Sequence, residues 1–339
     1  MEHRALGKSG LKVSPLCLGA MTFGDSQGFM KGVTSTDEEA RRILDASLDA
    51  GIDFVDTADV YGDGRSEELL GEWLEGRRQK IVLATKCRFP LGPRGSAGPN
   101  DRGLSRRHVI AACEASLRRL RTDWIDLYQT HLEDPEVPIE ETLSALDDLV
   151  HAGKVRYVGC SNYSAHRLVE SLWAADRRGT VGYESVQLQW SLVVRGAERE
   201  VVPACRAFGL GVLVWSPLAK GFLSGKYRRG EPAPKGSRLE VRVEAMRGLD
   251  ADRSWSILEE VRAVAGERGT TPAAVALAWL LARPEVSSVI VGARTALQLR
   301  ANLAATELEL SVPELARLDD ASAIEPGYPY DFIEALRRS

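Results

Sequence analysis

The stretch TDEEARRILDASLDAGIDFVDTADVYGDG (residues 36–64) contains one unit of helix followed by strand. Its first half, residues 36–50, has the apolar spacing of an amphipathic helix. Its second half contains a short apolar strand, residues 54–57, in which Asp56 lies near the carboxyl end and after which Tyr61 follows. We therefore expect a buried strand that carries polar side chains at its carboxyl end.

Units of this kind recur along the whole chain. Eight candidate strands lie at residues 16–19, 54–57, 81–86, 125–130, 155–161, 183–187, 211–215 and 287–292, with helical patterns between them. Because each pair of parallel strands needs a crossover, this alternation predicts a parallel sheet. Eight units without a break in composition predict one α/β domain over residues 1–339, a closed (β/α)8 TIM barrel rather than two doubly wound domains. The nearest approach to a dinucleotide-binding glycine motif, GDGRSE, has Glu67 in place of the third glycine.

Boundary signals support the expected helices. Thr36 and Glu39 have the spacing of a capping box, and Ser105 is a candidate N-cap. Gly153 follows a helical pattern, as glycine often does at a helix C-terminus, and Pro272 falls in a probable first turn.

Three kinds of segment lie outside the repeated units. Residues 1–15 are expected to form a hairpin that closes the bottom of the barrel, and residues 323–339 form a C-terminal tail. Residues 88–103 and 219–248 are long loops that follow the third and seventh candidate strands. Long loops in compact domains are usually functional or disordered, and active sites of such barrels form at the carboxyl face. We favour a functional role for both loops.

The composition excludes several classes of protein. With 44% hydrophobic residues, 27% charged residues and a net charge of −4, the chain reads as a globular protein without a nucleic-acid or membrane partner. Its longest apolar run, residues 273–282, is about half of a membrane span, and its start lacks an apolar signal segment. Five scattered cysteines predict a reduced, cytoplasmic protein, and the spacing of the histidines predicts no metal site.

Four polar side chains fall at the carboxyl ends of consecutive candidate strands. Asp56 and Tyr61 belong to the second strand and its loop, Lys86 ends the third strand, and His131 follows the fourth. Taken singly, each is more typical of a structural residue: a helix cap, a loop aromatic, a solvated strand end and a core histidine. Taken together they favour a site, because a buried lysine needs a partner and Asp56 lies on the neighbouring strand.

The four groups together form a unit that donates a proton. A phenol has a pKa near ~10, so Tyr61 on its own gives up its proton reluctantly at neutral pH. An ammonium beside it favours the phenolate and is expected to lower that pKa, and a carboxylate keeps the ammonium charged. A histidine N–H can hold a carbonyl oxygen at the same point. The set predicts protonation of a developing alkoxide, as carbonyl reduction requires.

At this point the chain resembles a known family. The segments DFVDTADVYGDGRSEELLG, ATK, DLYQTHLEDPEVP, GCSNY, WSPLAKGFLSGKY and GARTALQLRANL are similar to those of the aldo-keto reductases, over about residues 3–310. The resemblance implies a barrel that uses NADPH, with NADH less favoured. It also implies a catalytic tetrad: Tyr61 as the general acid, Lys86 and Asp56 tuning it, and His131 orienting the carbonyl.

The resemblance also implies a set of cofactor contacts. Ser161, Asn162 and Gln187 would hydrogen-bond the nicotinamide carboxamide, with Asp56, Ala20 and Met21 nearby. Trp215 would stack on the nicotinamide, although a tryptophan there is also typical of a core. The segment around the pyrophosphate comprises Ser216, Pro217, Leu218, Ala219 and Lys226. The segment around the adenosine comprises Gly292, Gln298 and Asn302, with Arg294 and Arg238 as candidates for the 2′-phosphate.

Some positions depart from the family pattern. Val291 replaces a common proline, Ala301 a common glutamate, Gln298 a common arginine and Ala20 a common threonine. These departures weaken the preference for NADPH over NADH without reversing it.

The substrate is expected to contact the loop after Lys86 and the side chains of Met21, Phe23 and Phe29. In the C-terminal tail, Tyr328, Tyr330 and Phe332 fit equally well as pocket residues and as structural aromatics. Within the loop, Arg88, Arg94 and Arg102 are expected to be solvated.

Two functions are consistent with these motifs. The first is NADPH-dependent reduction of an aldehyde or ketone, which the complete tetrad favours. The second is a redox-sensing regulatory subunit that binds NADP(H) with little turnover, as in family members resembling potassium-channel β subunits. The particular substrate and the oligomeric state are not readable from the sequence.

Overall fold

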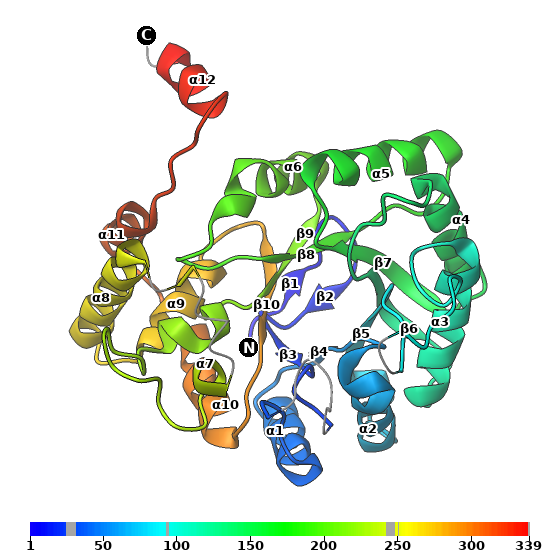
Figure 1. Cartoon of the computed structure of the whole chain (residues 1–339), viewed down its shortest axis with the longest axis horizontal. Coiled ribbons are helices and arrows are strands. Elements are labelled where there is room, and N and C mark those ends of the chain that lie inside the picture. Colours follow the sequence, from blue (N-terminus) through cyan, green and yellow to red (C-terminus); the bar gives the residue numbers. More distant parts are fainter. Residues whose placement is uncertain (25–31, 93–94, 242–247, 250, 338–339) are drawn as a thin grey trace.

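The chain folds into a closed barrel of eight parallel strands surrounded by helices (Figure 1). The structure is a computed structural model that describes residues 1–24, 32–92, 95–241, 248–249 and 251–337. The barrel strands follow one another around the ring in chain order, and β10 closes the ring by pairing with β3. They are β3 (Leu16–Gly19), β4 (Phe54–Asp56), β5 (Val82–Cys87), β6 (Ile125–Thr130), β7 (Val155–Ser161), β8 (Ser185–Gln189), β9 (Gly211–Trp215) and β10 (Val286–Val291). The eight-stranded barrel expected from the sequence is therefore confirmed.

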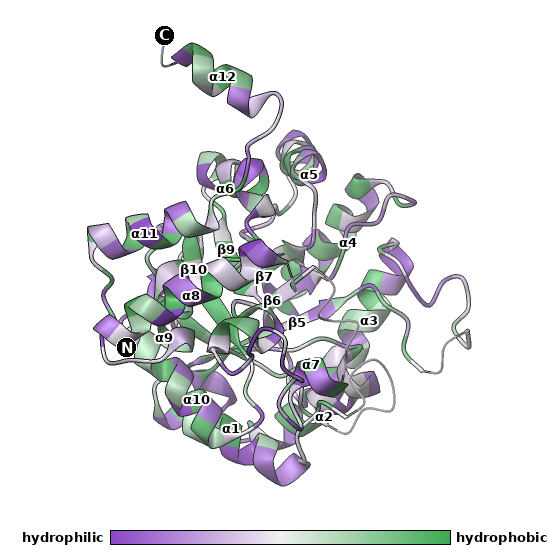
Figure 2. Cartoon of the chain, turned by 60° about the vertical axis from the view of Figure 1, so that its left-hand side comes forward, coloured by the Kyte–Doolittle hydropathy of each residue, from purple (hydrophilic) through white to green (hydrophobic). Residues whose placement is uncertain are grey.

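Helices alternate with these strands and form the outer layer. The α-helices are α1 (Asp37–Asp49), α2 (Arg65–Trp73), α3 (Arg106–Arg119), α4 (Ile139–His151), α5 (Ala165–Arg178), α6 (Val201–Phe208), α7 (Arg238–Val241), α8 (Asp252–Glu267), α9 (Pro272–Leu281), α10 (Ala296–Leu303), α11 (Val312–Ser322) and α12 (Tyr330–Arg337). Short 3-10 turns are η1 (Tyr61–Gly64), η2 (Arg78–Lys80), η3 (Gly196–Arg199), η4 (Ala219–Ser224) and η6 (Ala304–Thr306). Most helices turn apolar residues inward and polar residues outward (Figure 2).

The expected boundary residues cap their helices, with one difference. Thr36 and Ser105 accept the backbone N–H three residues on, and Pro272 lies at the start of α9. Glu39 does not complete a capping box, because its carboxylate accepts the backbone N–H of Ala296 at 3.1 Å. That bond ties α1 to the first turn of α10.

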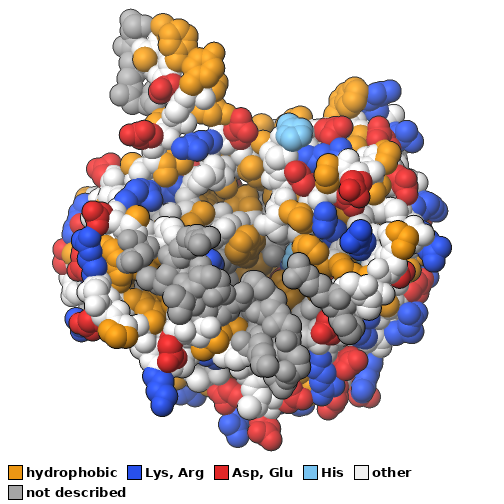
Figure 3. Space-filling view, viewed as in Figure 1, with side chains coloured by type: hydrophobic (Ala, Val, Ile, Leu, Met, Phe, Trp, Pro, Cys, Tyr) orange, Lys and Arg blue, Asp and Glu red, His pale blue; other side chains and the backbone are white. Residues whose placement is uncertain are grey.

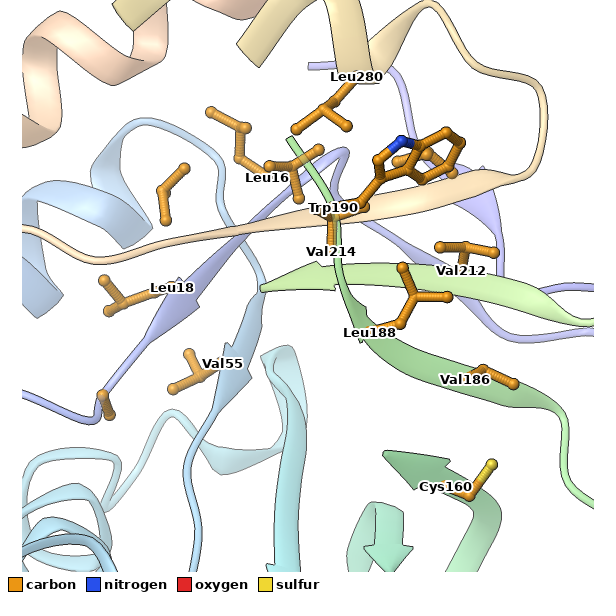
Figure 4. Packing of buried hydrophobic residues seen from close by; sticks show 14 of the residues in the cluster. Leu16, Leu18, Val55, Cys160, Val186, Leu188, Trp190, Val212, Val214 and Leu280 are labelled. Carbon is orange, nitrogen blue, oxygen red and sulfur yellow. The ribbon is translucent and has the colours of Figure 1, made fainter. Parts of the chain in front are cut away.

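Two hydrophobic clusters hold the barrel together. The larger lies between the outer face of the strands and the helices, where Leu16, Val55, Val186 and Leu280 pack (Figure 4). The smaller fills the inside of the ring with side chains such as Phe54. Each fully buried leucine or phenylalanine contributes about 1.5–3 kcal/mol of transfer free energy. The ring is therefore a packed core on which groups at the strand ends are fixed.

The N-terminal hairpin belongs to the inner cluster. Strands β1 (Arg4–Ala5) and β2 (Lys12–Val13) pair antiparallel, and Leu6 and Val13 are buried with the inner cluster. Gly7 has φ 58°, and a Cβ there would lie 2.5 Å from the backbone nitrogen of Gly211, so only glycine fits. The hairpin closes the barrel at its amino end, as the sequence predicted.

The C-terminal tail leaves the barrel instead of covering it. Figures 1 and 2 show α12 standing clear of the barrel wall, and Tyr328 and Phe332 are 85% and 59% exposed. The hydroxyl of Tyr330 donates a hydrogen bond to Glu200 on the outer surface. The hypothesis that these aromatics shape the pocket is therefore wrong. Within the described ranges, no helix combines the length and the apolar content of a membrane span.

Candidate active site

Lys86 is the centre of the polar cluster at the carboxyl end of the barrel. It ends the apolar run of β5, and its side chain is completely buried. The ammonium donates three hydrogen bonds: to the carboxylate of Asp56 at 2.6 Å, to the carbonyl of Thr57 at 2.7 Å and to the hydroxyl of Tyr61 at 3.4 Å. Burial lowers the pKa of Lys86, but the charges and hydrogen bonds of Asp56 and Tyr61 together outweigh it, and the pKa is raised overall. Lys86 therefore stays charged.

Asp56 is satisfied on both carboxyl oxygens. Besides the ammonium of Lys86 on Oδ2, the side-chain amides of Gln129 and Gln187 donate to Oδ1 at 3.0 and 2.9 Å. The carboxylate ends β4, and the register pairs Asp56 with Gly19 and Ala84 on the adjacent strands. A buried charge is tolerated when it is paired and hydrogen-bonded in this way.

Tyr61 lies where η1 begins and is half-buried. Its hydroxyl oxygen accepts from Lys86, so the phenolic proton is directed elsewhere. Burial raises the pKa of Tyr61, the ammonium of Lys86 lowers it, and Asp56 raises it again, with a net increase. The sequence analysis predicted a lowered pKa for Tyr61. That prediction is wrong for the protein without a bound ligand, because the effect of desolvation on this pKa is larger than the effect of the Lys86 ammonium.

His131 stands edge-on to Tyr61, with ring centroids 5.7 Å apart. Its backbone N–H donates to the carbonyl of Cys87 at 2.9 Å, which fixes the residue just after β6. Burial, and then the charges of Lys86 and Arg88, hold the pKa of His131 well below its usual range. The imidazole is therefore neutral and keeps one N–H donor. The structure thus brings all four expected tetrad residues together.

A second group of expected residues forms a network beside the tetrad. The indole N–H of Trp215 donates to the side-chain oxygen of Asn162 at 3.1 Å, and the amide of Asn162 donates to the hydroxyl of Ser161 and the carbonyl of His131, both at 3.0 Å. Trp215 is half-buried at the end of β9 and packs against the inner cluster. Gln187 lies two residues before the end of β8, and its amide nitrogen is used by Asp56 and Gln129.

Three cations from separate segments converge farther out. Partial desolvation lowers the pKa of Lys226, and the nearby charges of Arg294 and Arg238 lower it further. Arg294 is held in place because its guanidinium donates to the carbonyl of Gly236 at 2.7 Å and its backbone N–H donates to Gln298 at 3.0 Å. A phosphate placed beside these cations would gain charge-assisted hydrogen bonds from them.

Other expected cofactor positions are less accessible. Ala20 is fully buried and Ala219 and Asn302 are 1% and 5% exposed, as Ser161 and Gln187 are at 1% and 3%, and their contacts with a cofactor stay predictions. Pro217 is also buried, whereas Met21, Ser216 and Leu218 are half-buried and Gly292 is exposed at the mouth. The backbone N–H of Ala20 donates to the carbonyl of Asp56 at 2.8 Å.

The residues that were expected to contact the substrate fall into three groups: one in the core, one near the opening, and one outside the described residues. Phe23 is fully buried and packs edge-on against Trp73 at 6.1 Å, so it belongs to the core and the expectation for it is wrong. Met21 lies half-buried near the opening. Phe29 and Arg94 lie outside the described residues. The face of the molecule that is seen in Figure 3, in the same view as Figure 1, has a central hollow lined by apolar side chains.

Comparison with known proteins gives the same assignment. The model of the aldo/keto reductase family matches residues 15–323. The chain belongs to the aldo-keto reductase family. It is an oxidoreductase that acts on carbonyl or alcohol groups, and the family generally uses a nicotinamide cofactor.

Relatives of this aldo-keto reductase carry different names. An uncharacterized oxidoreductase, YrpG, of Bacillus subtilis is 41% identical over 94% of this chain and 95% of its own length. A probable voltage-gated potassium channel subunit beta of Arabidopsis thaliana is 39% identical over 91% and 92%. Versiconal hemiacetal acetate reductase of Aspergillus parasiticus is 33% identical over 96% and 99%.

The sequence reasoning missed a buried acidic pair, Asp59 and Glu67. In this reductase Asp59 is 1% exposed, and neither of its carboxyl oxygens accepts a well-formed hydrogen bond from a described residue. Glu67 beside it accepts from Thr85 at 2.5 Å and from Arg119 at 2.6 Å. Burial, and then the charge of Glu67, raise the pKa of Asp59 well above its usual range. Asp59 therefore holds its proton to a higher pH than an ordinary aspartate does.

Replacing Asp59 by asparagine is expected to change how stability depends on pH. The carboxyl of the unfolded chain ionises near ~3.9, whereas the folded protein holds the proton to a higher pH, so the free energy of unfolding falls as pH rises from the unfolded pKa to the folded pKa. Asparagine cannot titrate and removes that fall. We expect the free energy of unfolding of Asp59→Asn relative to the parent to be higher at pH 8 than at pH 5. Urea unfolding at both values measures this.

The matched control is Asp63→Asn, which changes an exposed aspartate in the same turn. The difference in free energy of unfolding between Asp63→Asn and the parent is expected to be the same at pH 5 and at pH 8. If Asp59→Asn behaved in the same way, Asp59 would be ionised in the folded protein and our assignment of its proton would be wrong.

Gln129 is the other residue that was missed. It lies inside the expected strand of residues 125–130, where one polar residue in an apolar run is not distinctive. In the barrel the register pairs it with Lys86, and it reaches the carboxylate of Asp56. The only available signal was its place on the strand that follows Lys86 and precedes His131.

Proposed function

We propose that this aldo-keto reductase reduces an aldehyde or ketone to an alcohol with NADPH, and that Tyr61 supplies the proton. One observation carries the proposal: the ammonium of Lys86 donates to the phenol oxygen, so the phenolic proton is left for a substrate. Bound NADPH supplies the hydride for the carbonyl carbon. Tyr61 then protonates the developing alkoxide oxygen, and Lys86 stabilises the phenolate that remains.

The other two tetrad residues support this step. Asp56 holds the ammonium of Lys86 in place and charged. His131, as a neutral imidazole beside Tyr61, offers an N–H to the carbonyl oxygen and fixes its position. Orientation of the reacting groups and stabilisation of charge at the oxygen each lower the barrier.

The cofactor assignment rests on the converging cations. Lys226, Arg238 and Arg294 provide positive charge that suits the 2′-phosphate of NADPH, a group that NADH lacks. We assign the nicotinamide carboxamide to Ser161, Asn162 and the oxygen of Gln187. Trp215 offers a half-exposed ring beside them for stacking.

A substrate panel tests the proposed function. NADPH oxidation is followed by absorbance with aldehydes, diketones and sugars. Turnover on at least one class of carbonyl is the expected outcome. Two relatives are named as probable voltage-gated potassium channel subunits beta, so a regulatory subunit is the second candidate. Tight NADPH binding without turnover on any compound would favour that candidate.

Replacing Arg294 by methionine tests the 2′-phosphate assignment. Loss of charge-assisted hydrogen bonds is expected to raise the KM for NADPH about tenfold to a hundredfold. The KM for NADH is expected to change no more than a few-fold, because NADH has no phosphate there. Steady-state kinetics with both cofactors measures this.

Arg300→Met changes an exposed arginine on the adjacent helix α10; it is the control and is expected to affect neither cofactor. Equal losses for NADPH and NADH in Arg294→Met would show that Arg294 does not recognise the 2′-phosphate.

A further inference from the structure

Arg88 is held in place beside the tetrad, and is not the solvated arginine that the sequence suggested. It follows β5 directly, and its backbone has φ 150°, a conformation that residues with a side chain rarely adopt. The N–H of Gly103 donates to its carbonyl at 2.8 Å, and its own Nε donates to the carbonyl of Glu133 at 3.2 Å. Arg88 is half-buried. Strained backbone of this kind concentrates at functional sites.

The carboxylates that flank Arg88 among the described residues bond to other groups. The neighbouring carboxylate of Glu133 accepts from the backbone N–H and the hydroxyl of Ser164. The carboxylate of Asp134 accepts the backbone N–H of Leu104. In the described part of the chain, no carboxylate forms an ion pair with Arg88, whose side chain donates to the carbonyl of Glu133 through Nε. The terminal N–H groups of the guanidinium therefore remain for a ligand.

An aromatic ring lies between this cation and the carbonyl-binding groups. The guanidinium carbon of Arg88 is 5.4 Å from the ring centroid of Phe89. The ring of Phe89 is edge-on to His131 at 5.0 Å, and His131 is edge-on to Tyr61 at 5.7 Å. The site thus has a proton donor at one end, an apolar wall, and then a cation.

We propose that Arg88 binds a carboxylate on the substrate, so that the preferred substrates are aldehydes or ketones with a carboxylate separated from the carbonyl by a short apolar spacer. This inference rests on the proposed reductase function. The carbonyl lies at Tyr61 and His131, the spacer packs against Phe89, and the carboxylate accepts two N–H bonds from the fork of Arg88. A mostly apolar pocket with one charged group that fixes orientation is the usual design of such sites.

Matched substrate pairs test the proposal. The probes are 4-oxobutanoate against butanal, and 4-formylbenzoate against benzaldehyde, with NADPH in excess. In the parent, kcat/KM is expected to favour the carboxylate in each pair. In Arg88→Met the ratio of kcat/KM within a pair is expected to fall about tenfold to a hundredfold. Arg88→Lys keeps the charge but loses the fork, and an intermediate ratio is expected.

Arg102→Met is the matched control, because Arg102 is an exposed arginine of the same loop. The ratio is expected to remain at the parent value in this variant. An unchanged ratio in Arg88→Met, or an equal fall in both variants, would overturn the proposal. A third pair, D-glyceraldehyde 3-phosphate against D-glyceraldehyde, separates carboxylate from phosphate. A larger preference for the phosphate would show that the carboxylate assignment is wrong.

A binding measurement separates this inference from the proposed function. Calorimetry compares benzoate with benzamide on the enzyme saturated with NADP+, and no turnover is needed. Tighter binding of benzoate that is lost in Arg88→Met supports the anion site even if no aldehyde is reduced. Turnover of butanal and benzaldehyde without any effect of Arg88 would support the reductase function and reject the anion site.

Discussion

Replacing Tyr61 by phenylalanine is expected to lower kcat for carbonyl reduction by about 10²–10⁴-fold, the usual contribution of a positioned proton donor. The substitution removes one oxygen and keeps the ring that lies edge-on to His131. Lys86 and Asp56 keep their own bond at 2.6 Å, so the remaining site is expected to stay assembled. The KM for NADPH is therefore expected to change little, because the cations near Lys226 are not affected.

The control for this substitution is Tyr157→Phe, which removes the hydroxyl of a tyrosine packed against the inner cluster of the barrel. Its kcat is expected to stay within a few-fold of the parent. Single-turnover measurements with NADPH and a good aldehyde isolate the chemical step. If Tyr61→Phe retained kcat within a few-fold in that assay, another group would be the proton donor.

The raised pKa of Tyr61 is consistent with its role as the proton donor. Burial raises it above the ordinary value although Lys86 acts in the opposite direction. A phenol that stays protonated through neutral pH is ready to act as an acid in reduction. The reverse reaction needs the phenolate, so alcohol oxidation is expected to favour higher pH than reduction does.

The fold could be predicted from the sequence because its determinants are local. The third candidate strand was placed within one residue of β5, and the fourth coincides with β6 (Ile125–Thr130). Short apolar runs, helix caps and strict alternation suffice to specify a parallel barrel. The tetrad could be located for the same reason, because the carboxyl ends of adjacent parallel strands meet.

What could not be predicted depends on burial, which a sequence does not show. Asp59 and Asp63 are alike in sequence, yet the first is buried and the second is exposed. Arg88 and Arg102 lie in one loop, and only Arg88 is held against the site. The sign of the Tyr61 pKa shift was likewise decided by desolvation, whose magnitude depends on three-dimensional packing.

Lys86→Met is expected to destabilise the fold as well as abolish most activity. The substitution leaves the Asp56 carboxylate 3% exposed without its cation, and removing one partner of a buried pair typically costs about 3–5 kcal/mol. Urea unfolding at pH 7 measures the loss. The orphaned carboxylate is expected to take up a proton, since burial without a cation raises its pKa. The deficit relative to the parent should therefore shrink as pH falls toward ~4.

The double variant Lys86→Met with Asp56→Asn separates the charge from the packing. Asparagine still offers an oxygen to the amides of Gln129 and Gln187, which donate to Asp56 Oδ1. With no buried charge left, the double variant is expected to be more stable at pH 7 than Lys86→Met alone, although it carries one more substitution. It is not expected to recover activity, because the ammonium that donates to Tyr61 is still missing. Equal stability of the single and double variants would mean that lost packing, and not an unpaired carboxylate, causes the damage. The ion pair would then stabilise the reaction and not the fold.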